Sequence, residues 1–145
     1  MLTLALLFVQ ASGPLDVYGT WVIPPDEEGG PSRGVVEVAK VDGAPVGTIA
    51  EVGEAYADDP EAGDALGMRI LWGFEADGDG DGWEDGKILD PEKGKTYRSK
   101  IRREGEALSV KGCVAFFCRE QVWQPADTDG EALNAGPSGS IRAER

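Results

Sequence analysis

The residues with the clearest potential for chemistry form an alternating acidic motif near the middle of the chain. Asp77, Asp79 and Asp81 alternate with glycines and are followed by Gly82. This D-x-D-x-D-G spacing matches the first half of a calcium-binding loop, in which carboxylates surround a hard cation and the glycine permits a sharp turn. Asp85 would occupy the ninth position of such a loop.

The second half of the motif departs from the calcium-binding pattern. The twelfth position, where a bidentate glutamate completes the ligand set, is occupied by Ile88. The flanking segments also have the composition of strands rather than helices. A solvated, glycine-rich hairpin tip explains the same residues without a metal. We therefore expect no cofactor, with weak calcium binding at these aspartates as the alternative.

Aromatic residues form a second group with potential for binding. Large rings line the pockets of many barrels, and five residues are candidates for a common cavity: Trp21, Trp72, Trp83, Tyr97 and Trp123. The same rings could instead fill the core, because a small domain with 41% hydrophobic residues needs large side chains to do so. A ligand cavity and a filled core therefore both remain open.

The sequence contains no recognisable catalytic constellation. Histidine, the commonest general base and transition-metal ligand, is absent. The acidic residues Glu51, Glu54, Asp58 and Asp59 could act as paired carboxylates, but charge runs in polar segments are usually solvated surfaces. We expect a protein that is not an enzyme, with a weak carboxylate-dependent hydrolase as the least favoured alternative.

A further polar group consists of Lys87, Asp90 and Tyr97. These residues could form a cluster that contacts a ligand. Alternatively, Asp90 accepts hydrogen bonds from the backbone of its own turn, Tyr97 packs inside with its hydroxyl near the rim, and Lys87 neutralises nearby acids. We favour this structural interpretation.

The net charge of −13 restricts the possible partners. A chain this acidic repels the phosphates of nucleic acids and disfavours anionic membrane surfaces. The basic stretch at 95–103 could meet an anionic partner, but we expect it to pair with carboxylates across the sheet. The expected partners are a small ligand or an envelope protein, and the expected state is a monomer without a membrane span.

The ends of the chain differ from its centre. Residues 1–11 are apolar, and Val9-Gln10-Ala11 fits a signal-peptidase site with cleavage before Ser12. The alternative is an ordinary first strand; a signal peptide this short suggests that the true start lies elsewhere. Residues 125–145 are small and polar and predict a disordered tail. Residues 12–124 then form the single domain.

Cys113 and Cys118 are the only cysteines in the sequence. They end two strand-like stretches that face each other across a short turn, so their thiols can come within bridging reach. The spacing is not the redox C-x-x-C, and two cysteines without histidine do not make a metal site. We expect a structural disulfide; a free buried pair and a redox pair are the alternatives.

Alternating hydrophobicity and frequent turns predict an all-β protein. Asp42-Gly43 is a strong hairpin turn, whereas residues 53–67 form an exposed acidic excursion with one possible helical turn. Eight short strands of this kind favour an antiparallel barrel that holds side chains or one small ligand. The predicted strands are 15–23, 35–41, 46–52, 68–74, 83–89, 95–103, 107–112 and 116–123.

Two resemblances extend this prediction. The pair Gly19-x-Trp21 resembles the G-x-W motif of lipocalins. The string W-x-x-G-K-I-x-D-P-x-x-G-K-T-Y at 83–97 resembles the signature of the uncharacterised bacterial envelope family known as domain of unknown function 2147. The likeness covers about residues 15–124 and includes the closing Gln121-x-Trp123.

The resemblance implies a lipocalin-like barrel that is exported to the periplasm or cell envelope, and it implies no chemistry. The sequence departs from the family pattern in two places. Val41 and Val46 stand near the position of a usual cysteine pair, and Gln124-Pro125 replaces a closing threonine-arginine. The expected function is binding of a small apolar or amphipathic ligand, and the alternative is a structural or protein-interaction module with a filled barrel.

Overall fold

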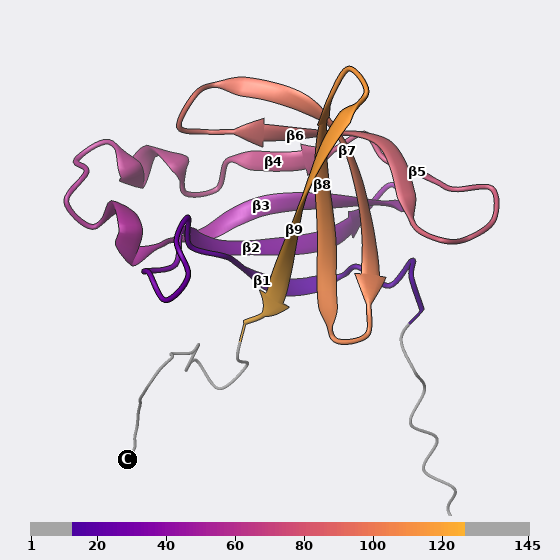
Figure 1. Cartoon of the computed structure of the whole chain (residues 1–145), viewed down its shortest axis with the longest axis horizontal. Coiled ribbons are helices and arrows are strands. Elements are labelled where there is room, and N and C mark those ends of the chain that lie inside the picture. The colour runs from indigo at the N-terminus through magenta and orange to yellow at the C-terminus, as the bar shows by residue number, and fades with distance from the viewer. Residues whose placement is uncertain (1–12, 127–145) are drawn as a thin grey trace, which may run out of the picture.

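The computed structural model describes residues 13–126. The predicted signal peptide and the tail beyond residue 126 lie outside the described residues. One antiparallel sheet has the strand order β4-β3-β2-β1-β9-β8-β7-β6-β5, and β4 also pairs with β6. This pairing closes eight of the nine strands into a barrel (Figure 1). The strands are β1 Gly19–Ile23, β2 Gly34–Val41, β3 Ala44–Val52, β4 Arg69–Trp72, β5 Glu75–Ala76, β6 Trp83–Asp90, β7 Lys95–Glu104, β8 Ala107–Val114 and β9 Phe117–Pro125.

The predicted eight-stranded antiparallel barrel is therefore confirmed. The turn at Asp42 and Gly43 is also confirmed, and both residues have positive φ angles, of 53° and 85°. Two consecutive positive φ angles give the type I′ turn, whose twist matches that of the flanking strands. The two-residue strand β5 was not predicted, because it is too short to show an alternating pattern.

The first strand is shorter than predicted, since β1 begins at Gly19 rather than at residue 15. The preceding residues form tight turns, in which the amide of Asp16 donates to the carbonyl of Gly13 and that of Val17 to the carbonyl of Leu15. Gly19 has a φ of 141°, a conformation that side chains rarely adopt. Strand pairing therefore starts at this glycine, which pairs with Val38.

Residues 13–18 cover one end of the barrel, which we call the closed end. The Trp21 indole donates to the carbonyl of Val17 at 3.0 Å, and the Trp83 indole donates to that of Leu15 at 2.9 Å. Val17 of this segment is itself buried, and it belongs to one cluster with buried side chains from the strands and the β4–β5 connection: Trp21, Val36, Val38, Leu71, Phe74, Ile101 and Leu108. The same buried cluster continues away from this end through Ile49, Ile70, Val110 and Trp123.

The close approach of Phe74 to β6 requires a glycine. A Cβ atom added at Gly86 would lie 2.2 Å from the Phe74 ring. The absence of a side chain at Gly86 lets this ring fill the barrel interior. The G-K-I part of the sequence motif therefore has a packing reason for its glycine.

The opposite end, which we call the mouth, carries the longer connections. The excursion between β3 and β4 contains two short 3-10 helices, η1 Glu54–Tyr56 and η2 Ala62–Ala65, neither of which has a buried residue. This agrees with the predicted exposed segment. At the tip of β8 and β9, Cys113 and Cys118 form the predicted disulfide. No helix among the described residues is both long and apolar enough to cross a membrane.

Candidate functional site

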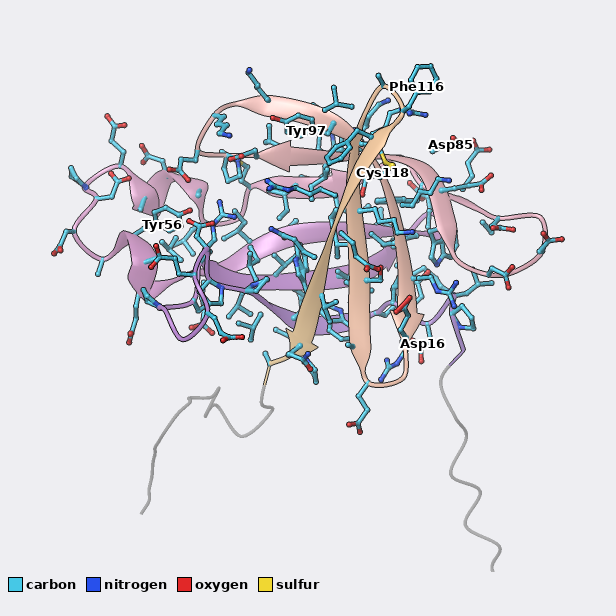
Figure 2. All side chains as sticks on the ribbon, in the orientation of Figure 1. Asp16, Tyr56, Asp85, Tyr97, Phe116 and Cys118 are labelled. Atoms are coloured by element: carbon cyan, nitrogen blue, oxygen red, sulfur yellow. A yellow bond between two sulfur atoms is a disulfide. The ribbon has the colours of Figure 1, made fainter. Side chains whose placement is uncertain are left out.

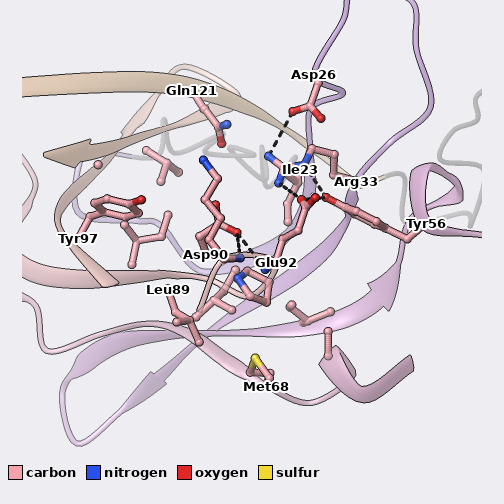
Figure 3. Close-up of a pocket in the computed structure, with 18 of the residues that line it drawn as sticks. Ile23, Asp26, Arg33, Tyr56, Met68, Leu89, Asp90, Glu92, Tyr97 and Gln121 are labelled. Atoms are coloured by element: carbon pink, nitrogen blue, oxygen red, sulfur yellow. Dashed lines mark hydrogen bonds and ion pairs between the residues drawn. The ribbon is translucent and has the colours of Figure 1, made fainter. Parts of the chain in front are cut away.

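A cavity of about 880 Å³ extends from the mouth into the barrel (Figure 3). This volume lies within the range of small-molecule sites, roughly 300–1,000 Å³. Its inner wall is apolar and is contributed by six strands, from the following residues: Ile23, Ile49, Ile70, Ile88, Val110 and Trp123. The interior is therefore not filled by side chains along its whole length.

Strand alternation explains how β9 contributes to this cavity. Phe117, Arg119, Gln121 and Trp123 all line it, and successive members are two residues apart. Side chains at this spacing point to the same face of a strand. The sequence becomes more polar toward the middle of β9 and more apolar at Trp123, so this strand supplies both polar groups and part of the apolar floor.

The five aromatic candidates do not surround a common cavity. Tyr97 and Trp123 line it, whereas Trp21 and Trp83 belong to the packing at the closed end. Trp72 does not line the cavity; its ring lies 5.0 Å from the guanidinium carbon of Arg69, in a cation–π contact. Trp123 has both roles, since it also belongs to the buried core, whereas Trp21 and Trp83 pack without lining the cavity.

Polar groups are present within the cavity as well as at its rim. The Oε1 atom of Gln121 accepts a hydrogen bond from the Trp123 indole at 2.9 Å. This bond does not use the amide nitrogen of Gln121, which can donate to a ligand. Tyr97 lines the same space. A ligand that is apolar along most of its length and carries a few hydrogen-bonding groups fits this arrangement.

A group of four side chains, which we call the mouth clamp, joins three segments at the rim (Figure 3). Arg33 Nε donates to the Tyr56 hydroxyl at 3.0 Å, and that hydroxyl donates to Glu92 at 3.0 Å. Arg33 also forms ion pairs with Asp26 at 3.5 Å and with Glu92 at 3.6 Å. The clamp holds the β1–β2 loop, the excursion and the β6–β7 loop together.

Protonation within the mouth clamp follows from partial burial. Desolvation raises the pKa of Tyr56 above its usual value and, together with the hydrogen bond to Glu92, outweighs the contact with Arg33, which lowers this pKa. Desolvation lowers the pKa of Arg33, but the contact with Tyr56 and the negative charges of Asp26 and Asp90 outweigh it and raise this pKa. Both side chains therefore keep their protons at neutral pH.

The excursion was predicted to be exposed, but it also contributes to the mouth through Tyr56. No sequence pattern indicated this role, since Arg33 lies in the β1–β2 loop and Tyr56 ends η1, two segments that the chain order does not bring together. The rim has an excess of negative charge. Three basic residues line the cavity, Arg33, Lys93 and Arg119, and so do six acidic ones: Asp26, Asp59, Glu61, Asp64, Asp90 and Glu92.

Lys87, Asp90 and Tyr97 do not form one cluster. Lys87 pairs with Trp72 and with Arg98 on the outside of the barrel, whereas Asp90 and Tyr97 line the cavity. The carboxylate of Asp90 accepts hydrogen bonds from the amides of residues 92 and 93, at 3.0 and 3.2 Å. Asp90 thus has the structural role in its turn that the sequence indicated.

The acidic motif is brought together only in part. Carboxylate oxygens of Asp77, Asp79 and Asp81 lie within 4.8 Å of one another. The Asp77 carboxylate also accepts the amide N–H of Asp79 at 2.6 Å, which shapes the loop. Asp85 is not part of this group; it lies in a bulge of β6 with a φ of 58°. Three of the four aspartates predicted as calcium ligands therefore lie close together, and the fourth does not.

Comparison with known proteins places these features in context. The model of the family described as "Uncharacterized protein conserved in bacteria (DUF2147)" matches residues 19–125. A search of solved structures found protein HP1028 from Helicobacter pylori, which its title assigns to the lipocalin family. The identity is 11%, the TM-score is 0.58, and the match covers 81% of this chain and 88% of that chain. No curated protein matched the sequence. The structural likeness shows a shared fold.

Proposed function

Because the chain belongs to the uncharacterised bacterial family DUF2147 and its barrel encloses a cavity, we propose that it binds a small amphipathic or apolar ligand and catalyses no reaction. The observation that carries this proposal is the cavity of about 880 Å³, with an apolar inner wall and a polar mouth. Such a site removes apolar surface from water while a few polar groups fix the orientation of the ligand.

We further propose that the protein acts in the periplasm or cell envelope. The disulfide between Cys113 and Cys118 supports this location, because structural disulfides persist in oxidising compartments. The signal peptide predicted at residues 1–11 supports it independently.

The alternatives have less support. A fully packed barrel is disfavoured by the cavity beside Trp123. The hydrolase considered from the sequence would need its own carboxylates in the cavity, but Glu51, Glu54 and Asp58 do not line it, and Asp59 lies on the excursion at its edge. The carrier function therefore explains the interior of the barrel best.

The first test is a native mass of the protein after export to a periplasm, purified without reductant or chelator. We expect an adduct of a few hundred daltons that leaves on denaturation. A protein that binds no adduct and no added apolar probe would contradict the proposal.

A second test fills the cavity from within. Gly112 lines the cavity, and a Cβ atom there would lie 3.6 Å from Ile88, an ordinary contact distance. We expect Gly112→Leu to weaken binding of the neutral probe N-phenyl-1-naphthylamine by roughly tenfold, since the added side chain occupies the apolar space. Lys111→Leu, one residue earlier and outside the cavity, is the matched control. Unchanged binding in a folded Gly112→Leu variant would contradict the proposed site.

A further inference from the structure

Apolar side chains are exposed at the tip of the β8–β9 hairpin, residues 113–118, which we call the hairpin tip. Phe116 is 104% exposed, Phe117 71% and Val114 59%. The hairpin projects beyond the rest of the barrel, and Phe116 lies at its end (Figures 1 and 2). Exposed apolar groups that gather at one site of a soluble domain usually mark an interaction surface.

The hairpin tip presents these side chains in a fixed arrangement. The disulfide joins Cys113 to Cys118, directly below the turn. The carbonyl of Ala115 accepts a hydrogen bond from Arg98 Nη2 at 2.9 Å, which connects the turn to the neighbouring strand β7. The two phenylalanines therefore lie on an ordered turn that is held from both sides.

The charge around the hairpin tip is opposite in sign to that of the whole chain. Four basic residues, Arg98, Lys100, Lys111 and Arg119, lie at the paired positions nearest the tip, with one acidic residue, Glu120, whereas the whole chain has a net charge of −13. Arg98 lies on the neighbouring strand β7 and Arg119 on β9, and Glu120 is the only acidic residue between 107 and 125. Its carboxylate accepts a hydrogen bond from Ser109.

This local charge modifies the expectation drawn from composition. The overall charge disfavours anionic membranes, but the acidic residues at the mouth gather on the excursion and its neighbours rather than on β8 and β9. The predicted cross-sheet pairing of the basic strand is also limited. Among the ion pairs of the described residues, only Arg102–Glu104 and Arg103–Asp16 involve it.

We propose that the hairpin tip docks the barrel onto an anionic phospholipid bilayer. Phe116 enters the interfacial region of the bilayer, and Arg98 and Arg119 approach the lipid phosphates. Aromatic side chains favour this region, and each nearby cation adds attraction to anionic lipids. Val114, Phe117 and Arg119 also line the cavity, so docking brings the mouth to the lipid surface. This surface goes beyond the proposed ligand binding and does not depend on it.

The test is flotation of the full chain, without added ligand, with vesicles of phosphatidylcholine alone or with one-third phosphatidylglycerol. We expect the protein to bind reversibly to the anionic vesicles. We expect its binding to the neutral vesicles to be roughly tenfold weaker. Phe116→Ser should reduce the partition coefficient by roughly tenfold. Leu66→Ser is the matched control, because Leu66 is also an exposed apolar residue near the mouth, at 54%, but lies on the acidic excursion. This control should bind as the unmodified protein does.

A second measurement reports insertion directly. Phe116→Trp should be quenched by brominated phosphatidylglycerol more strongly than the native tryptophans are in the unmodified protein. Equal flotation of the Phe116→Ser and Leu66→Ser variants, or equal binding to neutral and anionic vesicles, would overturn the proposal. A dimer in solution that Phe116→Ser dissociates, without vesicle binding, would also overturn it and assign the hairpin tip to self-association.

Discussion

The hydroxyl of Tyr56 connects two charged side chains that are far apart in sequence. It accepts from Arg33 and donates to Glu92. One atom thus links the excursion to two other loops, and this link can be removed without changing the shape of the side chain. Its contribution should depend on pH in a way that the raised pKa of Tyr56 determines.

We expect Tyr56→Phe to lower the free energy of unfolding by about 0.5–1 kcal/mol at neutral pH, the usual net value of a hydrogen bond. Because the pKa of Tyr56 is higher in the folded than in the unfolded state, the stabilisation by its hydroxyl is complete below pH 10. It is lost as the pH rises through the folded-state value. Urea unfolding of both proteins between pH 7 and 11 should show a difference that narrows only at the alkaline end.

Tyr18→Phe provides the control for this prediction. The hydroxyl of Tyr18 is the one buried side-chain polar atom in residues 13–126 that has no hydrogen-bond partner. Its removal should leave stability unchanged or raise it at neutral pH, because no bond is lost. A loss of stability as large as that of Tyr56→Phe would show that the mouth clamp contributes nothing specific.

Sequence patterns identified side chains in strands better than side chains in loops. The alternation of Tyr97, Ser99 and Ile101 indicated one inward face, and these residues are half-buried or buried in the structure. Arg33 and Glu92 meet only because two loops converge at the mouth. Local spacing carries no information about such a meeting, so the mouth clamp could not be predicted.

At the scale of elements, the β8–β9 hairpin combines a disulfide with an exposed aromatic turn. Cys113 and Cys118 are directly paired in the strand register and are separated by five positions. The closed loop is short, so the bond restricts the unfolded chain only modestly. It acts as a local constraint on the tip.

Replacement of both cysteines by serine should therefore lower the free energy of unfolding by about 2 kcal/mol. Chemical denaturation of the double variant, with the reduced native protein as control, measures this loss. The two should unfold at similar denaturant concentrations. A variant that no longer folds would mean that the hairpin constrains the whole barrel rather than its own tip.

The acidic loop between β5 and β6 is the second element with a specific prediction. Three aspartates lie together, but Asp85 is apart and Ile88 replaces the usual glutamate. With this incomplete ligand set, we expect calcium to bind there no more tightly than a dissociation constant of roughly 1 mM. Calorimetric titration should detect this binding in the native protein and in Asp85→Asn, but not in Asp79→Asn. Equal binding by Asp79→Asn would place the ion elsewhere.

Elements were predicted well where hydrophobic alternation and turn residues agreed. The β2–β3 hairpin, with Asp42-Gly43 at its turn, is the best example. The start of β1 was wrong, because residues 15–18 have strand-like composition but bond within their own turns. The excursion was correctly predicted as exposed, whereas its contact with the mouth depends on tertiary structure.

At the scale of the whole molecule, the barrel has unequal connections between neighbouring strands. β7–β8 and β8–β9 each have seven paired positions, whereas β3–β4, β4–β6 and β1–β9 each have two. The barrel is therefore closed on both sides of β4 by short contacts. Opening should begin where fewest hydrogen bonds must break.

We expect backbone amides of β4 to exchange with deuterium faster than those of β7 and β8. The opening free energies of the β4 amides should lie below the free energy of global unfolding. Their exchange then reports local opening next to the cavity wall at Ile70. Native-state exchange measured by NMR gives the comparison for each residue. Uniform protection across β4 and β7 would show that the barrel opens only as a unit.

The pairing of β1 with β9 joins the first and last strands of the described chain, at Trp21–Pro125 and Val22–Gln124. During synthesis β9 is the last strand to emerge, so a nascent chain that stops before residue 117 has unpaired edges on β1 and β8. Such edges readily pair with other chains. Closure of the barrel therefore waits for the final strand and requires a contact between the two ends of the described domain, the kind of non-local contact that slows folding.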